Sequence, residues 1–206
     1  MLKKLLSFGL VAVSVVLMSC GGSSGTITGG PGSGGPGGTV ATVQLVASSP
    51  TLKSDAAGTN KVTLTAVVKD SGNVIIEGVP VTFQTSSGSI TVLSATTDAL
   101  GQAIAELTNG LDPSNRAITV TASANGVSGT VTVNVVGTTL SITGPSALAL
   151  GDTGTYTVTL RDASGAGISG LTVAVTSATG NTLSSSSLTT GVGGQVTVNV
   201  TATAAN

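Results

Sequence analysis

The sequence predicts an all-β fold, in which tandem β-sandwiches follow a signal peptide and a flexible Gly-rich linker. Three observations predict it. First, valine, isoleucine and leucine alternate with threonine and other polar residues in short runs, as in KVTLTAVVKD at 61–70. Second, glycine, asparagine, aspartate and serine separate these runs, and third, the whole pattern occurs twice. β-branched residues between regularly spaced turn residues are typical of the short strands of a sandwich or barrel.

The first twenty residues, MLKKLLSFGLVAVSVVLMSC, differ from the rest of the chain. Lys3 and Lys4 precede an apolar run from Leu5 to Met18, which is shorter than the roughly 20 residues that a transmembrane helix needs. A positively charged N-terminal region, a short apolar run and a small residue before the cleavage site are typical of a secretory signal. The sequence therefore predicts a signal peptide over residues 1–19.

The end of this segment, Leu17, Met18, Ser19 and Cys20, resembles the bacterial lipobox. The resemblance implies cleavage before Cys20 and attachment of a diacylglycerol to its sulfur, so that membrane lipid is a predicted partner through acylated Cys20. The alternative is an ordinary cleaved signal followed by an unrelated cysteine. Cys20 is the only cysteine of the chain, which favours lipidation and excludes an intramolecular disulfide. In the same family, Gly21 implies delivery to the outer membrane.

Residues 20–40 hold the lipidated cysteine and an uncharged stretch of glycine, serine, proline and threonine. Such a composition predicts a flexible tether with an r.m.s. span of roughly 25 Å. A phosphate-binding loop is the alternative, but the stretch follows no predicted strand and opens no helix. The tether is therefore expected to hold the first folded module away from the lipid surface.

The repeat begins after the tether. Lys69 and Asp70 reappear as Arg161 and Asp162, 92 positions later, and GVPV at 78–81 reappears as GLTV at 170–173. A repeat of this length is close to the roughly 100 residues of an immunoglobulin-like sandwich. The sequence therefore predicts one immunoglobulin-like domain over residues 41–137 and a second over residues 138–206.

The first copy resembles the group 1 bacterial immunoglobulin-like domains of the intimin and invasin type. The segments that carry the resemblance are TLTAVVKDSGN, GVPVTFQTSSGSI, ATTDALGQAIAELT and ITVTASANG. The family implies display at the cell surface and adhesion, with a protein or host-surface partner. The second copy departs from the pattern at Val175 and Gly191, and after the strand that matches Ala103–Leu107 only a few residues follow.

We therefore expect the second domain to lack its last hairpin, which leaves sheet edges and an apolar face open. Two interpretations of this stay open. The chain is part of a longer array of repeats, or a strand from another chain completes the domain.

No enzymatic chemistry is predicted. The chain has no histidine, and lipid occupies its one thiol, which excludes the nucleophile–histidine sites and most zinc sites. Loss of residues 1–19 removes two lysines and leaves five basic and eight acidic residues, which argues against nucleic acid. The sequence therefore predicts no catalytic residue, no cofactor and no small-molecule substrate.

The scattered carboxylates are interpreted as turn residues, because aspartate accepts local backbone hydrogen bonds. The alternative is calcium bound by Asp70, Asp98 or Asp162 with neighbouring carbonyls. Phe83 is expected in the core and Tyr156 at a corner or in water. Gly72, Gly101, Gly165 and Gly194 are expected to adopt a positive φ.

Together these features predict a lipid-anchored protein of the cell envelope whose modules act as a structural stalk or spacer, with a role in adhesion. The alternative is a binding module that captures a protein partner through an exposed sheet edge.

Overall fold

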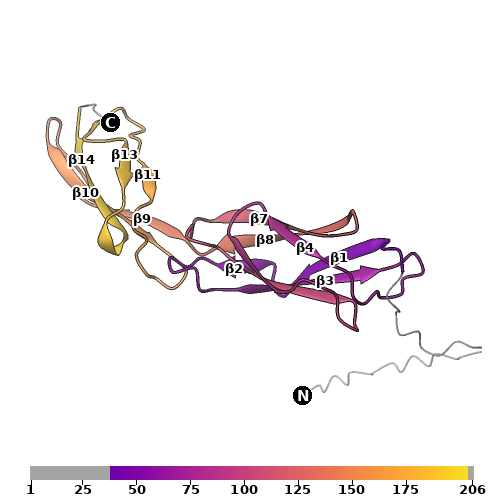
Figure 1. The fold of residues 1–206 in the computed structure, drawn as a ribbon. Coiled ribbons are helices and arrows are strands. Elements are labelled where there is room, and N and C mark those ends of the chain that lie inside the picture. Colours follow the sequence, from indigo (N-terminus) through magenta and orange to yellow (C-terminus); the bar gives the residue numbers. More distant parts are fainter. Residues whose placement is uncertain (1–37, 204–206) are drawn as a thin grey trace, which may run out of the picture. The chain divides into compact units, whose positions relative to one another are not determined.

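The computed structural model describes residues 38–203. Within this range the structure is all-β, and its one helical element is the short 3-10 turn η1, Val192–Gly194. The predicted all-β fold is confirmed. The strands form two groups, which we call the first module (residues 38–137) and the second module (residues 138–203) (Figure 1).

Two four-stranded sheets make the first module. One sheet has the order β1-β3-β6-β5, with every neighbouring pair antiparallel. Its strands are β1 Thr42–Ala47, β3 Val62–Lys69, β5 Ser89–Ser94 and β6 Gln102–Thr108. The other sheet has the order β2-β8-β7-β4, in which the pair of β2 and β8 is parallel. Its strands are β2 Thr51–Lys53, β4 Thr82–Thr85, β7 Arg116–Ala124 and β8 Val127–Val136.

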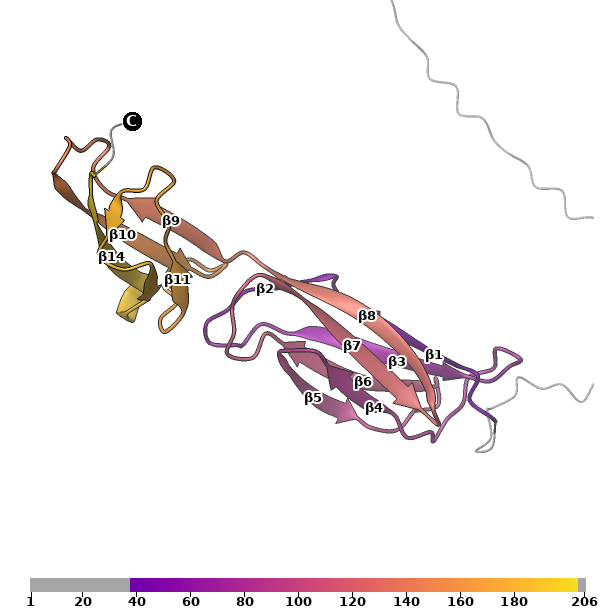
Figure 2. The same ribbon diagram turned by 90° about the horizontal axis from the view of Figure 1, so that it is seen from above.

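The core lies between these two sheets, as the alternation in the sequence requires (Figures 1 and 2). In β3, Leu64, Ala66 and Val68 are fully buried while the residues between them reach the surface. A strand directs successive side chains to opposite faces, so each apolar residue of the run enters the core. Val40, the last residue of the predicted tether, is also buried in this core.

At one edge of the first module, β8 approaches β1 closely. A Cβ atom built on Gly129 of β8 would lie 2.1 Å from the carbonyl oxygen of Val43 in β1. No side chain fits this space, so the absence of one at residue 129 is what lets β8 close over β1.

The second module contains a four-stranded sheet of order β12-β14-β10-β9 and a two-stranded sheet of β11 and β13. Its strands are β9 Thr139–Thr143, β10 Thr153–Arg161, β11 Thr172–Ala174, β12 Thr182–Leu183, β13 Ser187–Thr189 and β14 Gln195–Thr201. The four-stranded sheet corresponds to β5-β6-β3-β1 of the first module. Within residues 138–203, no strands follow β14 in the way that β7 and β8 follow β6.

Matched hydrogen bonds underlie the repeat. A threonine is buried at the same place in each module, Thr97 in the first and Thr190 in the second. The Oγ1 atom of Thr97 accepts from the Val79 amide at 2.9 Å, and that of Thr190 accepts from the Leu171 amide at 3.1 Å. The backbone carbonyl of Thr97 also accepts from the Gly78 amide, and that of Thr190 accepts from the Gly170 amide. The sequence repeat therefore reflects a repeated local structure.

Candidate interaction surface

The main difference between the modules lies on the first strand of each. The register of β1 on β3 and of β9 on β10 places Val43 at the same point as Leu140, and Leu45 at the same point as Ile142. Val43 and Leu45 are 5% and 7% exposed, whereas Leu140 and Ile142 are 58% and 56% exposed. The β7–β8 hairpin covers the first pair, and no described residue covers the second. We call the uncovered side of β9, β10 and β11 the open face.

Two hollows lie along the open face. One, of about 220 Å³, is lined by Leu140, Ser141, Ile142, Val158, Val173, Ala174, Val175 and Thr176. The other, of about 310 Å³, shares three of these residues and extends to Ser114 and Asn115 of the first module. None of the residues that line the hollows is charged. The open face is therefore suited to an apolar, uncharged partner and offers no group for acid–base chemistry.

A free backbone edge runs beside these hollows. In the first module β4 pairs with β7, with Phe83 opposite Ala122. The corresponding segment of the second module, residues 174–177, begins in β11, which pairs with β13 on one side. The Val175 amide donates to the Ser186 carbonyl on that same side. Because amides alternate along a strand, those of Ala174 and Thr176 face the side on which β7 pairs in the first module.

The junction of the two modules is short and hydrogen-bonded. Only Gly137 and Thr138 separate β8 from β9. The Ala56 amide of the first module donates to the Asp162 carboxylate at 3.1 Å, and the Ala163 amide donates to the buried Ser54 Oγ at 2.9 Å. These contacts were not expected from the sequence, because nothing in the pattern places a loop at 54–56 beside a turn at 162–163.

The connector itself is fixed from the first module. The side chain of Asn115 donates to the Thr138 carbonyl at 2.9 Å and accepts from the Thr138 amide at 2.9 Å. The Thr138 hydroxyl donates to the Pro113 carbonyl. A two-residue connector held at three points has little conformational freedom left, so it orders the start of β9.

The predicted calcium residues are turn residues in the structure. Asp70 accepts from the Gly72 and Val74 amides, at 2.8 and 2.9 Å. Asp98 accepts in the same way from the amides two and four residues later. Asp162 accepts from the amides of Ser164 and Ala166 and, in addition, from Ala56. The turn interpretation is confirmed for these three aspartates.

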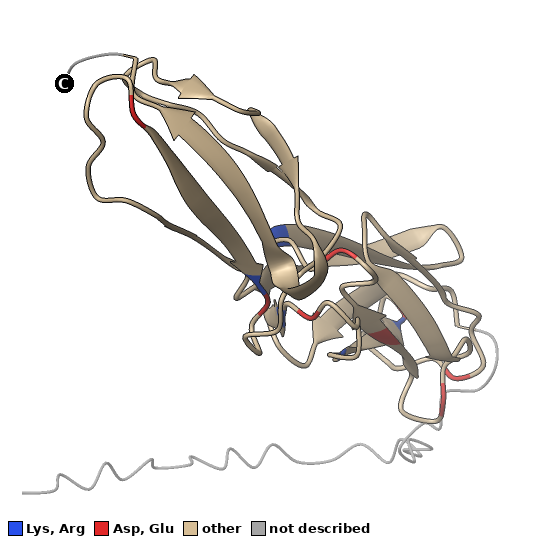
Figure 3. Ribbon diagram, turned by 90° about the vertical axis from the view of Figure 1, so that its left-hand side faces the viewer, with Lys and Arg blue, Asp and Glu red and all other residues tan. Residues whose placement is uncertain are grey.

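Charged residues are sparse and lie mostly on loops (Figure 3). Across residues 38–203, no group of three histidine, cysteine, aspartate or glutamate side chains is placed to hold a metal ion. Burial raises the pKa of Asp162, but the hydrogen bonds from Ser164 and the Ala56 amide outweigh it, so that its pKa is lowered. The pKa of Asp55 is lowered to about 2, because the Thr59 hydroxyl and the Ala57 amide donate to it.

The aromatic and glycine predictions have a mixed outcome. Phe83 packs against the core, and the Tyr156 hydroxyl donates to the Pro145 carbonyl at 2.9 Å, so both expectations are confirmed. Gly101 has a φ of 67°, and a Cβ there would lie 2.9 Å from that of Ile75. The expectation for Gly72 is wrong, because Asn73 takes the positive φ of that turn, at 63°. Asparagine tolerates this conformation through local hydrogen bonding.

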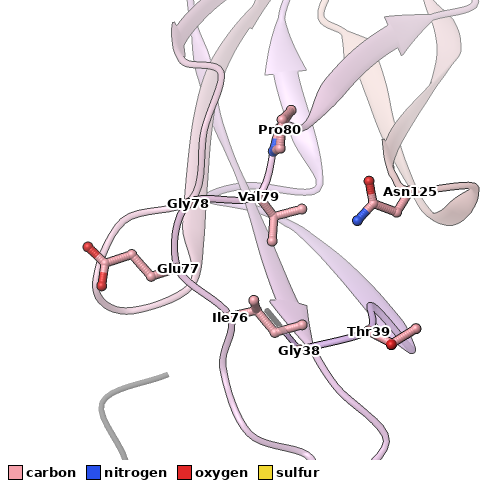
Figure 4. Close-up of a pocket in the computed structure, with 8 residues that line it drawn as sticks. All are labelled: Gly38, Thr39, Ile76, Glu77, Gly78, Val79, Pro80 and Asn125. Carbon is pink, nitrogen blue, oxygen red and sulfur yellow. The ribbon is translucent and has the colours of Figure 1, made fainter. Parts of the chain in front are cut away.

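A further hollow of about 390 Å³ lies where residues 38 and 39 enter the first module. Ile76, Val79, Pro80 and Asn125 border it, and the carboxylate of Glu77 points away from the other labelled side chains (Figure 4). No charged group is therefore directed into the hollow.

The predicted lipid site, Cys20, and the lipobox residues Leu17, Met18 and Ser19 lie outside the described residues, as does most of the predicted tether. In the described part of the chain, no helix has the length and apolarity that a bilayer crossing requires.

Comparison with known proteins finds relatives of the first module in sequence and in fold. Residues 44–136 match the family model of the bacterial Ig-like domain (group 1). No curated protein matches the chain in sequence. Among solved structures, the adhesin InvE of Yersinia pseudotuberculosis is 23% identical, with a TM-score of 0.58 over 83% of this chain and 55% of that one. Invasin, a bacterial integrin-binding protein, is 23% identical, with a TM-score of 0.45 over 81% of this chain and 36% of that one.

This chain thus spans about half the length of the InvE structure, and the likeness to InvE is one of fold. Residues 44–136 are thus similar to the bacterial Ig-like domain of group 1, and the described part of the chain shares its β-sandwich fold with an adhesin of Yersinia pseudotuberculosis.

Proposed function

We propose that the chain is a lipid-anchored protein of the cell envelope whose immunoglobulin-like modules act as a structural stalk or spacer in adhesion. The observation that carries the proposal is the junction. A spacer must transmit position from one module to the next. Here the Asn115 side chain holds the two-residue connector, while Asp162 and Ser54 accept hydrogen bonds that join the two modules beside it.

The match of the first module to bacterial Ig-like domains and the fold shared with an adhesin support the same role. The chemistry of the surface agrees with it as well. Asp70 and Asp98 accept turn amides, Glu106 forms an ion pair with Lys61 at 2.6 Å, and no catalytic arrangement forms part of the proposal.

The anchor is the second part of the proposal. Leu17, Met18, Ser19 and Cys20 form the lipobox, and two or three acyl chains on Cys20 bind a bilayer stably because each buried methylene contributes about 0.8 kcal/mol. Gly21 favours the outer membrane. The Gly-rich tether then separates the first module from the lipid surface.

Metabolic labelling with a palmitate analogue tests the anchor. The unaltered chain should incorporate the label and fractionate with membranes, and Cys20→Ser should lose both properties. Ser19→Ala is the matched control, because it keeps a small residue before the cysteine and should retain the label. Labelling of Cys20→Ser at the level of the unaltered chain would contradict lipidation.

Protease added to intact cells tests the stalk. Loss of both modules from intact cells is the result expected for a surface stalk. Protection of the modules in intact cells, with digestion after the outer membrane is opened, would confine them to the periplasm and exclude surface adhesion.

A second candidate function rests on the open face of the second module. Exposed Leu140 and Ile142 at a sheet edge favour capture of a protein partner by strand pairing. This candidate predicts that the purified chain assembles with another chain. A folded chain that remains monomeric and binds nothing counts against it.

A further inference from the structure

The chain contains two Asn-Gly pairs, Asn109-Gly110 and Asn125-Gly126. An asparagine that precedes a glycine can lose its side-chain amide without an enzyme, when the backbone nitrogen of the glycine attacks the Cγ atom of the asparagine. Glycine favours this reaction because it has no side chain to block the approach and its backbone adopts many conformations. The two pairs differ in exposure, hydrogen bonding and packing, so the fold decides which of them reacts.

Asn125 and Gly126 form the two-residue turn between β7 and β8, with φ values of 48° and 83°. Both residues are exposed, and Figure 4 shows the Asn125 side chain at the hollow where residues 38 and 39 enter the module. Among the described residues, neither the Asn125 side chain nor the Gly126 amide has a hydrogen-bond partner. A Cβ atom built on Gly126 would meet nothing within 4 Å beyond the two neighbouring residues. Water therefore reaches both reacting groups, and the turn has room to adjust.

Asn109 is fully buried. Its side-chain nitrogen donates to the backbone carbonyl of Asp55 at 2.7 Å and to that of Asp112 at 3.3 Å. The Gly110 amide, which would be the nucleophile, donates to the Thr108 hydroxyl at 3.2 Å. The Asn109 Oδ1 atom is buried and accepts no hydrogen bond from the described residues. Attack on Cγ places negative charge on this oxygen, and a buried charge without a donor is costly, so the fold opposes the reaction here.

We propose that Asn125 is a site of spontaneous deamidation and that the fold protects Asn109. Hydroxide removes the proton of the Gly126 amide, and the nitrogen forms a bond to Cγ of Asn125. The bond from Cγ to the side-chain nitrogen then breaks, and ammonia leaves with a proton taken from water, which restores the hydroxide. Water opens the resulting five-membered succinimide at either carbonyl and yields aspartate or isoaspartate. This inference goes beyond the stalk function and does not depend on the lipid anchor.

The two products differ in their effect on the β7–β8 hairpin. Aspartate is suited to the same turn, because Asp-Gly, like Asn-Gly, adopts the two positive φ values of a type I′ turn. Isoaspartate carries the chain through the former side chain, so the backbone gains one atom between Ala124 and Val127, which pair across the turn. We therefore expect isoaspartate to loosen the tip of the hairpin. Either product places a carboxylate at a hollow into which no charged group is directed.

Ageing of the purified chain tests the proposal. The chain is incubated at mildly alkaline pH, digested with trypsin and analysed by mass spectrometry. Cleavage after Lys69, Arg116 and Arg161 places Asn109 in the peptide 70–116 and Asn125 in the peptide 117–161, and fragmentation locates the asparagine that has gained a carboxyl group. In the folded chain we expect Asn125 to react at least about ten times faster than Asn109, which corresponds to a difference of about 1.4 kcal/mol in activation free energy.

The same incubation in guanidinium chloride is the control for the role of the fold. Both pairs then belong to an open chain and should react at similar rates. Equal rates at the two asparagines of the folded chain would overturn the proposal. So would an Asn125 that stays intact in the folded chain while it reacts in the denaturant.

Asn125→Asp is the matched variant for the products, because it carries the new charge without the extra backbone atom. Labelling by an isoaspartate methyltransferase should appear in the peptide 117–161 of the aged chain and be absent from that of the variant. Hydrogen exchange of the Val127 amide should be several-fold faster in the isoaspartate form than in Asn125→Asp. Equal exchange would contradict the expected loosening of the hairpin.

Discussion

The two modules use closely similar sequence signals and differ in what covers their first strand. Leu140 and Ile142 are at least as apolar as Val43 and Leu45, yet they are more than half exposed while the matched pair is buried. The side chains alone do not decide this. Burial in the first module comes from the β7–β8 hairpin, whose sequence lies more than 70 positions after Val43. The comparison teaches that the alternation of a strand predicts which face is apolar, but not whether that face is covered.

The turns at Asp70 and Asp162 likewise share a local structure and differ in their contacts with distant segments. Both carboxylates accept hydrogen bonds from the backbone amides two and four residues later, so the local structure is repeated. Asp162 is 4% exposed and also accepts from Ala56, because its turn meets the first module. One turn motif thus serves as a local cap in one module and as a junction contact in the other.

The largest expected effect comes from matched alanine substitutions on the covered face of the first module and on the open face of the second. Leu45→Ala should lower the free energy of unfolding of the first module by about 2–4 kcal/mol, because it removes a buried side chain and leaves a cavity. The matched change Ile142→Ala should cost the second module less than about 1 kcal/mol, since that side chain is mostly in water. Denaturation followed by circular dichroism and by Tyr156 fluorescence separates the two modules. Equal costs at the two positions would show that the open face is covered in solution.

The close approach of β8 to β1 supplies the next prediction. Gly129→Ala should destabilise the first module by about 1–3 kcal/mol, because the new Cβ meets the Val43 carbonyl and the strands must separate. Ser128→Ala, at an exposed position of the same strand, is the control and should stay within about 0.5 kcal/mol. The measurement is the urea midpoint of the circular dichroism signal. A neutral Gly129→Ala would mean that the hairpin does not close over β1 as described.

The two aspartate turns can be compared by matched substitutions. Asp162→Ala should cost about 1–2 kcal/mol and should lower the midpoints of both modules, because it removes acceptors from its own turn and from Ala56. Asp70→Ala should lower only the midpoint of the first module. Fluorescence and circular dichroism, recorded in one titration, give both midpoints. The junction would lose its assigned role if Asp162→Ala affected the second module alone.

The smallest expected effect is a pH dependence of the first module. The pKa of Asp55 is about 2 in the folded chain against an ordinary value of 3.8, so folding favours its ionised form. The stabilisation is complete above about pH 4 and is lost as the pH falls toward 2. Asp55→Asn should therefore flatten this part of the curve of unfolding free energy against pH. An unchanged curve would show that the hydrogen bonds from Thr59 and Ala57 do not stabilise the carboxylate.

Local signals in the sequence predicted the features that depend on neighbours along the chain. These are the strands, the apolar residues of β3, the aspartate turns and the repeat of about 92 residues. The positive φ at Asn73 was missed because both glycine and asparagine are suited to that turn, and the pattern does not say which of two adjacent residues takes it. The contacts of Ser54 and Asp162 were missed because they join positions more than 100 residues apart.

The sequence by itself determined that this protein is all-β, that its strands have one apolar face, and that Asp70, Asp98 and Asp162 lie in turns. It also predicts a lipobox that ends at Cys20, and this stays a prediction for the labelling experiment. Only the tertiary structure decided that Val43 and Leu45 are covered while Leu140 and Ile142 are open, and that the second module meets the first at Ala56 and Asp162. The reason is physical. Side-chain alternation and turn hydrogen bonds act over a few residues, whereas covering a face and joining two modules depend on which distant segments the fold brings together.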